Sequence, residues 1–303
     1  MAAASAVPVQ PPSFEERLKA VPWKGWDGRA SDPGRFALLV DWLKVDRRAA
    51  MEFLAKNRFR ELRNPAVARA VGEKATASEL LEIANGAESP WDAVFGAGKW
   101  ASPGVVNAMA DLMPSVIPEA AGPTAGAVAG LLAGINLDRA MAFAISQQTD
   151  QVRAAAIGGI FDELRSGANG EAEIRSLYGS LPPALQNSDP VLFSYGNAIW
   201  GSDPVAALQA LEGISSPKMR GMGLITLSQN AASASPETAI AAVYAAPGMS
   251  DQAIYNHVSQ ILQNWNAVDP QAAAKFLSTT QIIPTADVAK FSPIVAPAGG
   301  GKG

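Results

Sequence analysis

The amino-acid sequence predicts an all-α fold, a right-handed α-solenoid of about seven to eight helical hairpins. Three observations predict it. A helix-start motif recurs with a period near 33 residues, which is typical of stacked helix-turn-helix units. Apolar residues between these motifs follow helical spacing. Alternating or β-branched runs that favour strands are few. With 303 residues, 48% of them hydrophobic, the chain is long enough to bury a large core.

The first segment of the chain predicts a linker followed by an end cap. Residues 1–13 are rich in Ala and Pro and have neither a basic start nor a long apolar core, so they read as a flexible linker and not as a signal peptide. If this linker follows a trimmed export or anchor segment the protein is periplasmic, and otherwise it is cytoplasmic. Residues 14–40 are interpreted as an N-terminal capping segment, in which Trp23 and Trp26 cover the end of the first repeat.

Three strong copies of one motif define the repeat. Each copy has Asp, two variable residues, Ala-Ala, and Leu eight residues after the Asp, and a Trp precedes the Asp by three or four residues. The copies start at Asp46, Asp203 and Asp269, after Trp42, Trp200 and Trp265. Asp accepts hydrogen bonds from the free N–H groups of a new helix, and Pro, present in the last two copies, suits its first position. Ala lets that helix pack closely against its neighbour.

Weaker helix starts fill the gaps between the strong copies. They are expected at Ser78, Ser102, Asp138, Asn169 and Ser235. Together the starts predict an α-helical repeat domain over residues 41–285, with the least regular register between 85 and 125, where Gly and Pro are frequent. The residues that follow, 286–303, end in a Gly-rich run and are expected to form a flexible tail.

The second helix of a repeat supplies the predicted binding residues. Within Gln252 to Trp265 the apolar residues fall on one helical face. The polar side of this helix, with two arginines near the start of earlier second helices, is predicted to contact a partner: Arg153, Arg220, Asn256, His257, Gln260 and Asn264. For the two arginines a structural bridge to a neighbouring cap or carbonyl is the alternative. If first helices line the groove instead, the contacts are Gln209, Gln271 and Lys275.

Residues for catalysis are scarce. The chain has no Cys and a single His, which excludes thiol catalysis, disulfides, Cys-ligated zinc and a paired-His metal site. Phosphate-binding loops and a nucleophile elbow are absent, so neither a cofactor nor a metal is expected. The alternative is a lyase or glycan-cleaving enzyme on a helical array, using Tyr255, His257 and a nearby Arg.

Charge is distributed unevenly. The net charge is −4 overall, but residues 1–65 carry +4 and the remainder −8. A second alternative is therefore a nucleic-acid-binding repeat that uses the basic cluster Lys44, Arg47, Arg48, Lys56, Arg58, Arg60 and Arg63. Nucleic acid is nevertheless an unlikely partner for an acidic chain in which Glu52 and Glu61 interrupt this cluster.

Membrane insertion is not expected. The longest uncharged stretch, Ala120 to Leu137, contains Pro123 and four glycines, so it is a poor bilayer span.

The repeat resembles known helical-repeat families. Its period is like that of the TPR and HEAT classes of α-solenoid, although the TPR consensus residues are missing. The motif of Trp, two or three residues, and Asp-Pro-x-Ala-Ala is similar to one found in bacterial helical-repeat proteins; the copy at Asp46 departs from it in having Arg47 in place of Pro. The resemblance implies a non-catalytic scaffold or accessory subunit that mediates protein–protein interaction, with another protein or a peptide segment as partner.

Overall fold

The computed structural model of the chain describes residues 12–21, 33–167 and 170–295. Over these residues it forms nineteen α-helices and two short 3-10 helices and contains no strand. The all-α fold predicted from sequence is therefore confirmed. Several predictions fall outside the described residues: most of the linker (1–11), Trp23 and Trp26 of the capping segment, the helix start at Asn169, and the last part of the tail (296–303).

The chain divides into two compact units, Met1–Ser146 and Gln147–Gly303. The helices of the first unit are α1 (Phe14–Ala20), α2 (Pro33–Val45), α3 (Arg47–Lys56), the 3-10 helix η1 (Arg60–Arg63), α4 (Pro65–Gly72), α5 (Ala77–Gly86), α6 (Pro90–Gly98), α7 (Pro103–Leu112), the 3-10 helix η2 (Met113–Ser115), α8 (Pro118–Ala133) and α9 (Leu137–Ser146). Those of the second unit are α10 (Asp150–Leu164), α11 (Gly170–Ser180), α12 (Pro183–Gln186), α13 (Asp189–Ile199), α14 (Pro204–Glu212), α15 (Pro217–Ala231), α16 (Pro236–Ala245), α17 (Asp251–Val268), α18 (Pro270–Thr279) and α19 (Thr285–Val295).

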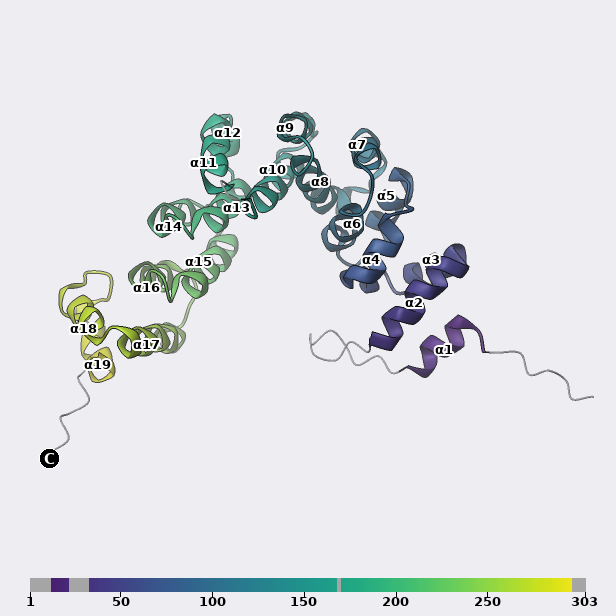
Figure 1. Cartoon of the computed structure of the whole chain (residues 1–303). Helices are drawn as coiled ribbons and strands as arrows, with labels where there is room; N and C mark the ends of the chain where they lie inside the picture. Colours follow the sequence, from purple (N-terminus) through teal and green to yellow (C-terminus); the bar gives the residue numbers. More distant parts are fainter. Residues whose placement is uncertain (1–11, 22–32, 168–169, 296–303) are drawn as a thin grey trace, which may run out of the picture. The chain divides into compact units, whose positions relative to one another are not determined.

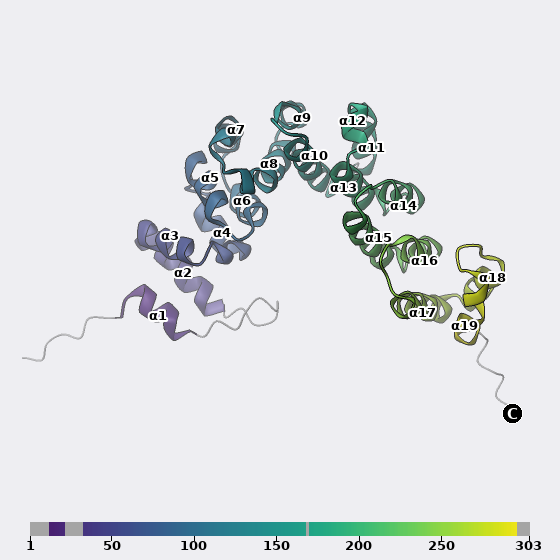
Figure 2. The same cartoon turned by 180° about the vertical axis from the view of Figure 1, so that it is seen from behind.

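Within each unit the helices are arranged in two layers (Figure 1 and Figure 2). In the first unit α2, α4, α6 and α8 pack in succession, and α3, α5, α7 and α9 lie on the other side. In the second unit α10, α13 and α15 pack in succession, and α14 packs on α16 in the other layer. This alternation of paired helices is consistent with a helical-repeat solenoid.

At each strong copy of the motif an Asp residue bonds to both of the helices that it separates. At Asp46 and Asp269 it is the single residue between them, whereas residues 200–203 separate α13 from α14. The Asp backbone N–H donates to the carbonyl oxygen four residues earlier, at 2.8 Å for Asp46, 3.0 Å for Asp203 and 2.7 Å for Asp269. The Asp side chain accepts from the amide three residues later, at 3.1, 2.9 and 2.9 Å. The same Asp residue therefore bonds to the end of one helix and caps the next; the cap is the part that the sequence pattern predicted.

Two weaker starts share part of this arrangement. Ser235 has nearly the backbone angles of the three Asp caps, and its N–H donates to Ala231 at 2.8 Å, but its hydroxyl bonds to that of Thr238 and not to a backbone amide. The start expected at Asp138 lies at Asn136 instead, whose side chain accepts from the amide of Arg139 at 2.9 Å. The start expected at Ser78 also lies two residues earlier, at Thr76, where Thr76 and Glu79 form a capping box. At both Asn136 and Thr76, two cap-forming residues lie two positions apart, and the earlier one makes the capping hydrogen bond.

Small residues fill the space behind each joint. The fourth residue after the joint is Ala with no exposed surface in all five cases: Ala50, Ala140, Ala207, Ala239 and Ala273. Elsewhere Gly allows a close approach, since a Cβ on Gly72 of α4 would lie 1.9 Å from the carbonyl oxygen of Ala97 in α6. Helix pairs in both units are thus held at short range by side chains that occupy almost no space.

Aromatic contacts reinforce two of the joints. Trp42 packs on Phe53 with ring centroids 5.5 Å apart and an interplanar angle of 46°. Trp265 packs on Phe276 at 5.2 Å and the same 46°. Trp42 is buried, as predicted, whereas Trp265 and Trp200 are half-buried. The joint at Asp203 has Ala210 where the other two have Phe, so Trp200 has no equivalent ring to pack on.

The expected flexible tail begins with a helix. Helix α19 spans Thr285–Val295, whereas the sequence pattern placed a flexible tail over 286–303. Phe291 and Val295 of α19 are buried, and the Phe291 ring stacks on Tyr255 of α17 at 5.4 Å. Burial of this apolar face stabilises the helix against the loss of chain entropy.

Replacing the joint residue should destabilise the fold. Asp269→Ala removes the side-chain acceptor for the amide of Ala272, and we expect the free energy of unfolding to fall by about 0.5–2 kcal/mol. Asp269→Asn keeps an oxygen in that position and should stay near the wild-type value. Urea titration followed by circular dichroism measures both. An Ala variant that unfolds at the wild-type urea concentration would show that this joint is not a cap.

Candidate functional site

Helix α17 presents the predicted polar face. It begins after the N-cap Ser250, whose hydroxyl accepts from the amide of Ala253 at 3.3 Å, and it runs for 18 residues. The predicted apolar face packs inward: Val258, Ile261 and Leu262 are buried. Helices α16, α18 and α19 contact α17. Because these contacts use the apolar face, the opposite face is left to solvent.

That opposite face carries a row of carboxamides. Asn256, Gln260 and Asn264 are exposed, as is Gln252, which the sequence analysis did not include. The Gln252 amide donates to the Asn256 side-chain oxygen at 2.9 Å, and the Gln260 amide donates to that of Asn264 at 3.0 Å. We name Gln252, Asn256, Gln260 and Asn264 the carboxamide row. Each hydrogen-bonded pair still has one oxygen and one NH₂ group facing solvent.

His257 lies beside the row and is held by its own helix. It is half-buried, and its Nδ1 lies 3.0 Å from the carbonyl oxygen of Ala253. A carbonyl only accepts, so Nδ1 carries a proton and donates it there. This is the boundary position expected of a residue at the edge of an apolar stripe.

The two predicted arginines hold the loops from which their helices start. Arg153 donates through Nε to the carbonyl of Gln147 at 2.8 Å and also pairs with Asp150. Arg220 donates to the carbonyl of Ile214 at 3.3 Å. Both arginines thus bind the carbonyl six residues earlier, which matches the structural bridge considered as the alternative. Their predicted role in binding a partner stays a prediction.

The basic cluster of the first unit is largely paired with carboxylates. Five of its seven members form ion pairs: Lys44 with Asp41, Arg47 with Glu79, Arg48 with Glu52, Arg60 with Glu88, and Arg63 with Asp92. The pairs of Arg47, Arg60 and Arg63 each join residues 28 to 32 positions apart in the sequence, so they connect successive repeats. Paired cations neutralise fewer phosphates, which weakens the nucleic-acid alternative.

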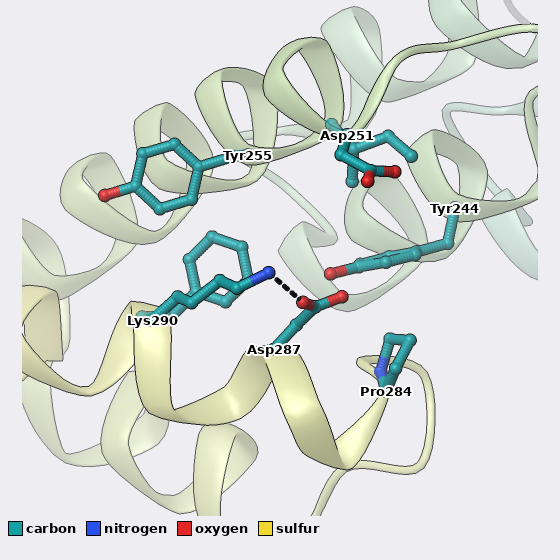
Figure 3. Close-up of a pocket in the computed structure, with 8 residues that line it drawn as sticks. Tyr244, Asp251, Tyr255, Pro284, Asp287 and Lys290 are labelled. Carbon is teal, nitrogen blue, oxygen red and sulfur yellow. Dashed lines mark hydrogen bonds and ion pairs between the residues drawn. The ribbon is translucent and has the colours of Figure 1, made fainter.

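A cavity lies beside the first turns of α17, on the face that packs on neighbouring helices. It measures about 280 Å³ and lies between α16, α17 and α19 of the second unit (Figure 3). Its apolar lining is Ile254, Pro284 and Phe291, and its polar lining is Tyr244, Asp251, Tyr255, Asp287 and Lys290. Neither His257 nor any arginine lines it, so the cavity does not gather the three groups that the enzyme alternative requires.

The polar groups of the cavity face one another. The Lys290 ammonium pairs with the Asp287 carboxylate, beside the Tyr244 hydroxyl, and Asp251 lies above them (Figure 3). The hydrogen bond and charge of Asp287, and more weakly the charge of Asp251, raise the pKa of Lys290. The Tyr244 oxygen exposes less than 1 Å² and has no hydrogen-bond partner among the described residues. Burial, with the charge of Asp287, raises the pKa of Tyr244 to about 12.

This cavity was not predicted from the sequence because three of its eight lining residues come from α19. Asp287, Lys290 and Phe291 lie in the segment expected to be a flexible tail. A signal was present in Val288, Phe291 and Val295, which follow the i, i+3, i+7 spacing of one helical face.

The described residues contain neither a metal-ligand cluster nor a helix that could span a membrane. No group of three or more His, Cys, Asp or Glu side chains there could hold a metal ion. None of the helices there combines the length and apolar character that crossing a bilayer requires.

Comparison with known proteins adds no relative: no family model, curated protein or solved structure matches this chain. A function has to be argued from the residues of the chain itself.

The buried Tyr244 hydroxyl should lose its proton at a higher pH than an ordinary tyrosine does. We expect tyrosinate absorbance to show a component with a pKa of about 12, which Tyr244→Phe removes. Asp287→Asn should lower that pKa, because it removes a neighbouring negative charge. Since the folded-state pKa is raised, Tyr244 should also make the fold less stable as pH rises from about 10 to about 12. Loss of a component near pH 10 in Tyr244→Phe would contradict this environment.

Proposed function

We propose that this chain is a non-catalytic helical-repeat protein that binds another protein, and that an extended segment of the partner lies along the carboxamide row of α17. In this proposal the helix pairs form a right-handed α-solenoid of seven or eight hairpins, similar to the TPR and HEAT classes. The exposed, uncharged carboxamide row is the observation that carries the proposal.

The chemistry of the row suits a peptide backbone. A carboxamide offers one acceptor oxygen and donor N–H groups, the same pair that a peptide unit carries. Asn256 accepts from Gln252 and keeps its NH₂ group for a partner, and Gln260 donates to Asn264 and keeps its side-chain oxygen. Hydrogen bonds of this kind contribute about 0.5–1.5 kcal/mol each, so several are needed for useful affinity.

The spacing of the row also suits an extended chain. Its members are four residues apart, which at a helical rise of about 1.5 Å per residue places them about 6 Å apart along the axis. An extended peptide repeats every two residues, at about 6.6–6.8 Å. Alternate peptide units can therefore meet successive carboxamides, and side chains between them point away from α17.

The first-helix alternative remains open in this proposal. Gln209, Gln271 and Lys275 are exposed in the other layer, but no side-chain hydrogen bonds align them into a row. For the enzyme alternative, the His257 ring is held by its own backbone, and no arginine lines the cavity beside α17. We therefore favour binding through α17.

Selection from a random peptide library displayed on phage tests the proposal. The immobilised full chain should enrich peptides that bind, and the double variant Asn256→Ala/Gln260→Ala should weaken that binding about tenfold, the equivalent of two lost hydrogen bonds. The matched control Gln209→Ala/Gln271→Ala changes two exposed carboxamides of the other layer and should leave affinity unchanged.

The opposite pattern would move the site to the first helices. If the selected peptides lose affinity in the Gln209→Ala/Gln271→Ala variant and keep it in the α17 variant, the assignment to α17 is wrong. If no peptide is enriched above background, the peptide-binding role itself is contradicted.

A further inference from the structure

We propose that the cavity between α16, α17 and α19 binds the cationic side chain of a Lys or Arg residue, and that it selects partner segments carrying such a residue. The identity of the cation as part of a protein segment rests on the proposed function; the cation site itself does not. The proposal stands on the charge, the aromatic walls and the size of the cavity.

The charge of the lining favours a cation. Two carboxylates, Asp251 and Asp287, face a single ammonium, that of Lys290. Lys290 pairs with Asp287, while Asp251 forms no ion pair among the described residues. Asp251 also occupies the first turn of α17, where a helix N-terminus favours negative charge. That position accounts for an acidic residue there, but not for a cavity that opens beside it.

The walls of the cavity add aromatic surface and a buried acceptor. Tyr244 and Tyr255 line it from two different helices, and Tyr255 stacks on Phe291, a third ring of the lining, at 5.4 Å. Aromatic faces attract Lys and Arg side chains by about 0.5–2 kcal/mol. The Tyr244 oxygen, which has no partner, lies beside the charged groups and can accept a hydrogen bond from an incoming N–H (Figure 3).

The size of the cavity fits one side chain of a longer ligand. At about 280 Å³ it lies at the lower end of small-molecule sites, which begin at about 300 Å³. It is too small for a large cofactor. Asp251, Ile254 and Tyr255 lie on the face of α17 that packs on its neighbours, roughly opposite the carboxamide row, so the cavity is a site separate from the row. An anionic side chain would meet two carboxylates, and an apolar one would leave Asp251 unneutralised.

Nuclear magnetic resonance on the isotopically labelled full chain tests the site directly. The probes are the methylamides of acetyl-lysine and acetyl-arginine, compared with those of acetyl-norleucine and acetyl-glutamate at equal concentration. We expect saturable shifts of the Asp251, Tyr255 and Lys290 amides with the two cationic probes only. Norleucine keeps the aliphatic stem without the charge, so equal shifts with norleucine would overturn the proposal, as would absence of saturable shifts with both cations.

Three variants separate the cation site from a merely structural cluster. Asp251→Asn should lower the affinity for the lysine probe about fivefold, which corresponds to the loss of one partly exposed charge pair. Asp150→Asn is the matched control, since Asp150 is likewise the first residue of its helix, after the N-cap Thr149, and it should leave affinity unchanged. Lys290→Gln removes the competing internal ammonium and should strengthen binding. Unchanged affinity in Asp251→Asn, or weaker binding in Lys290→Gln, would contradict the site.

The result of the magnetic resonance experiment is independent of the result of the peptide selection. Saturable binding of the lysine probe without any enriched peptide would leave the cation site standing and remove the protein segment as its ligand. Enriched peptides that depend on the carboxamide row but contain no required Lys or Arg would overturn only the selection of cationic segments; the probe shifts decide the cation site itself.

Discussion

The rest of the structure depends on the joint in which one residue ends a helix and starts its antiparallel neighbour. At Asp46, Asp203 and Asp269 the backbone N–H closes the first helix while the carboxylate caps the second. At Asp46 and Asp269, where no further loop residues are present, the two helices must pack almost from their first turn. Only a small side chain fits where they approach, which is why the fourth residue is a fully buried Ala at every such joint. The joint thus fixes both the pairing of helices and the face that each buries.

This constraint also decides which residues are left for function. Because α17 buries Val258, Ile261 and Leu262 against its neighbours, its carboxamides have no place except the solvent-facing side. Helix α19 then packs on α17 through Phe291 and brings Asp287 and Lys290 beside Asp251. The proposed peptide surface and the proposed cation site are therefore consequences of how α17 is packed, and both lie on one helix. Arg153 and Arg220, in contrast, hold the loops before their helices and so preserve the geometry of each repeat.

Whether a feature could be predicted from the sequence depends on how many residues separate the groups that interact. The joints at Asp203 and Asp269 were predictable because their hydrogen bonds span only three or four residues, and the polar side of α17 was predictable from its 3.6-residue period. The shift from Asp138 to Asn136 was not, because either residue can cap a helix. The cavity was not predictable either, since it requires α19 to pack on α17, and the Gly-rich end of the chain concealed the spacing of Val288, Phe291 and Val295. The pairing of Arg47 with Glu79, 32 residues away, likewise requires that helices be placed in space.

The most direct test of this account compares two alanines of α3. Ala50 is the fully buried residue four positions after the joint, and Ala55 is exposed on the same helix. Leu is nearly as good a helix former as Ala, so the same substitution separates packing from propensity. If the joint forces close packing, Ala50→Leu lowers the free energy of unfolding by about 1–3 kcal/mol, and Ala55→Leu stays within about 0.5 kcal/mol of wild type. Equal denaturant stability of the two variants would contradict the account.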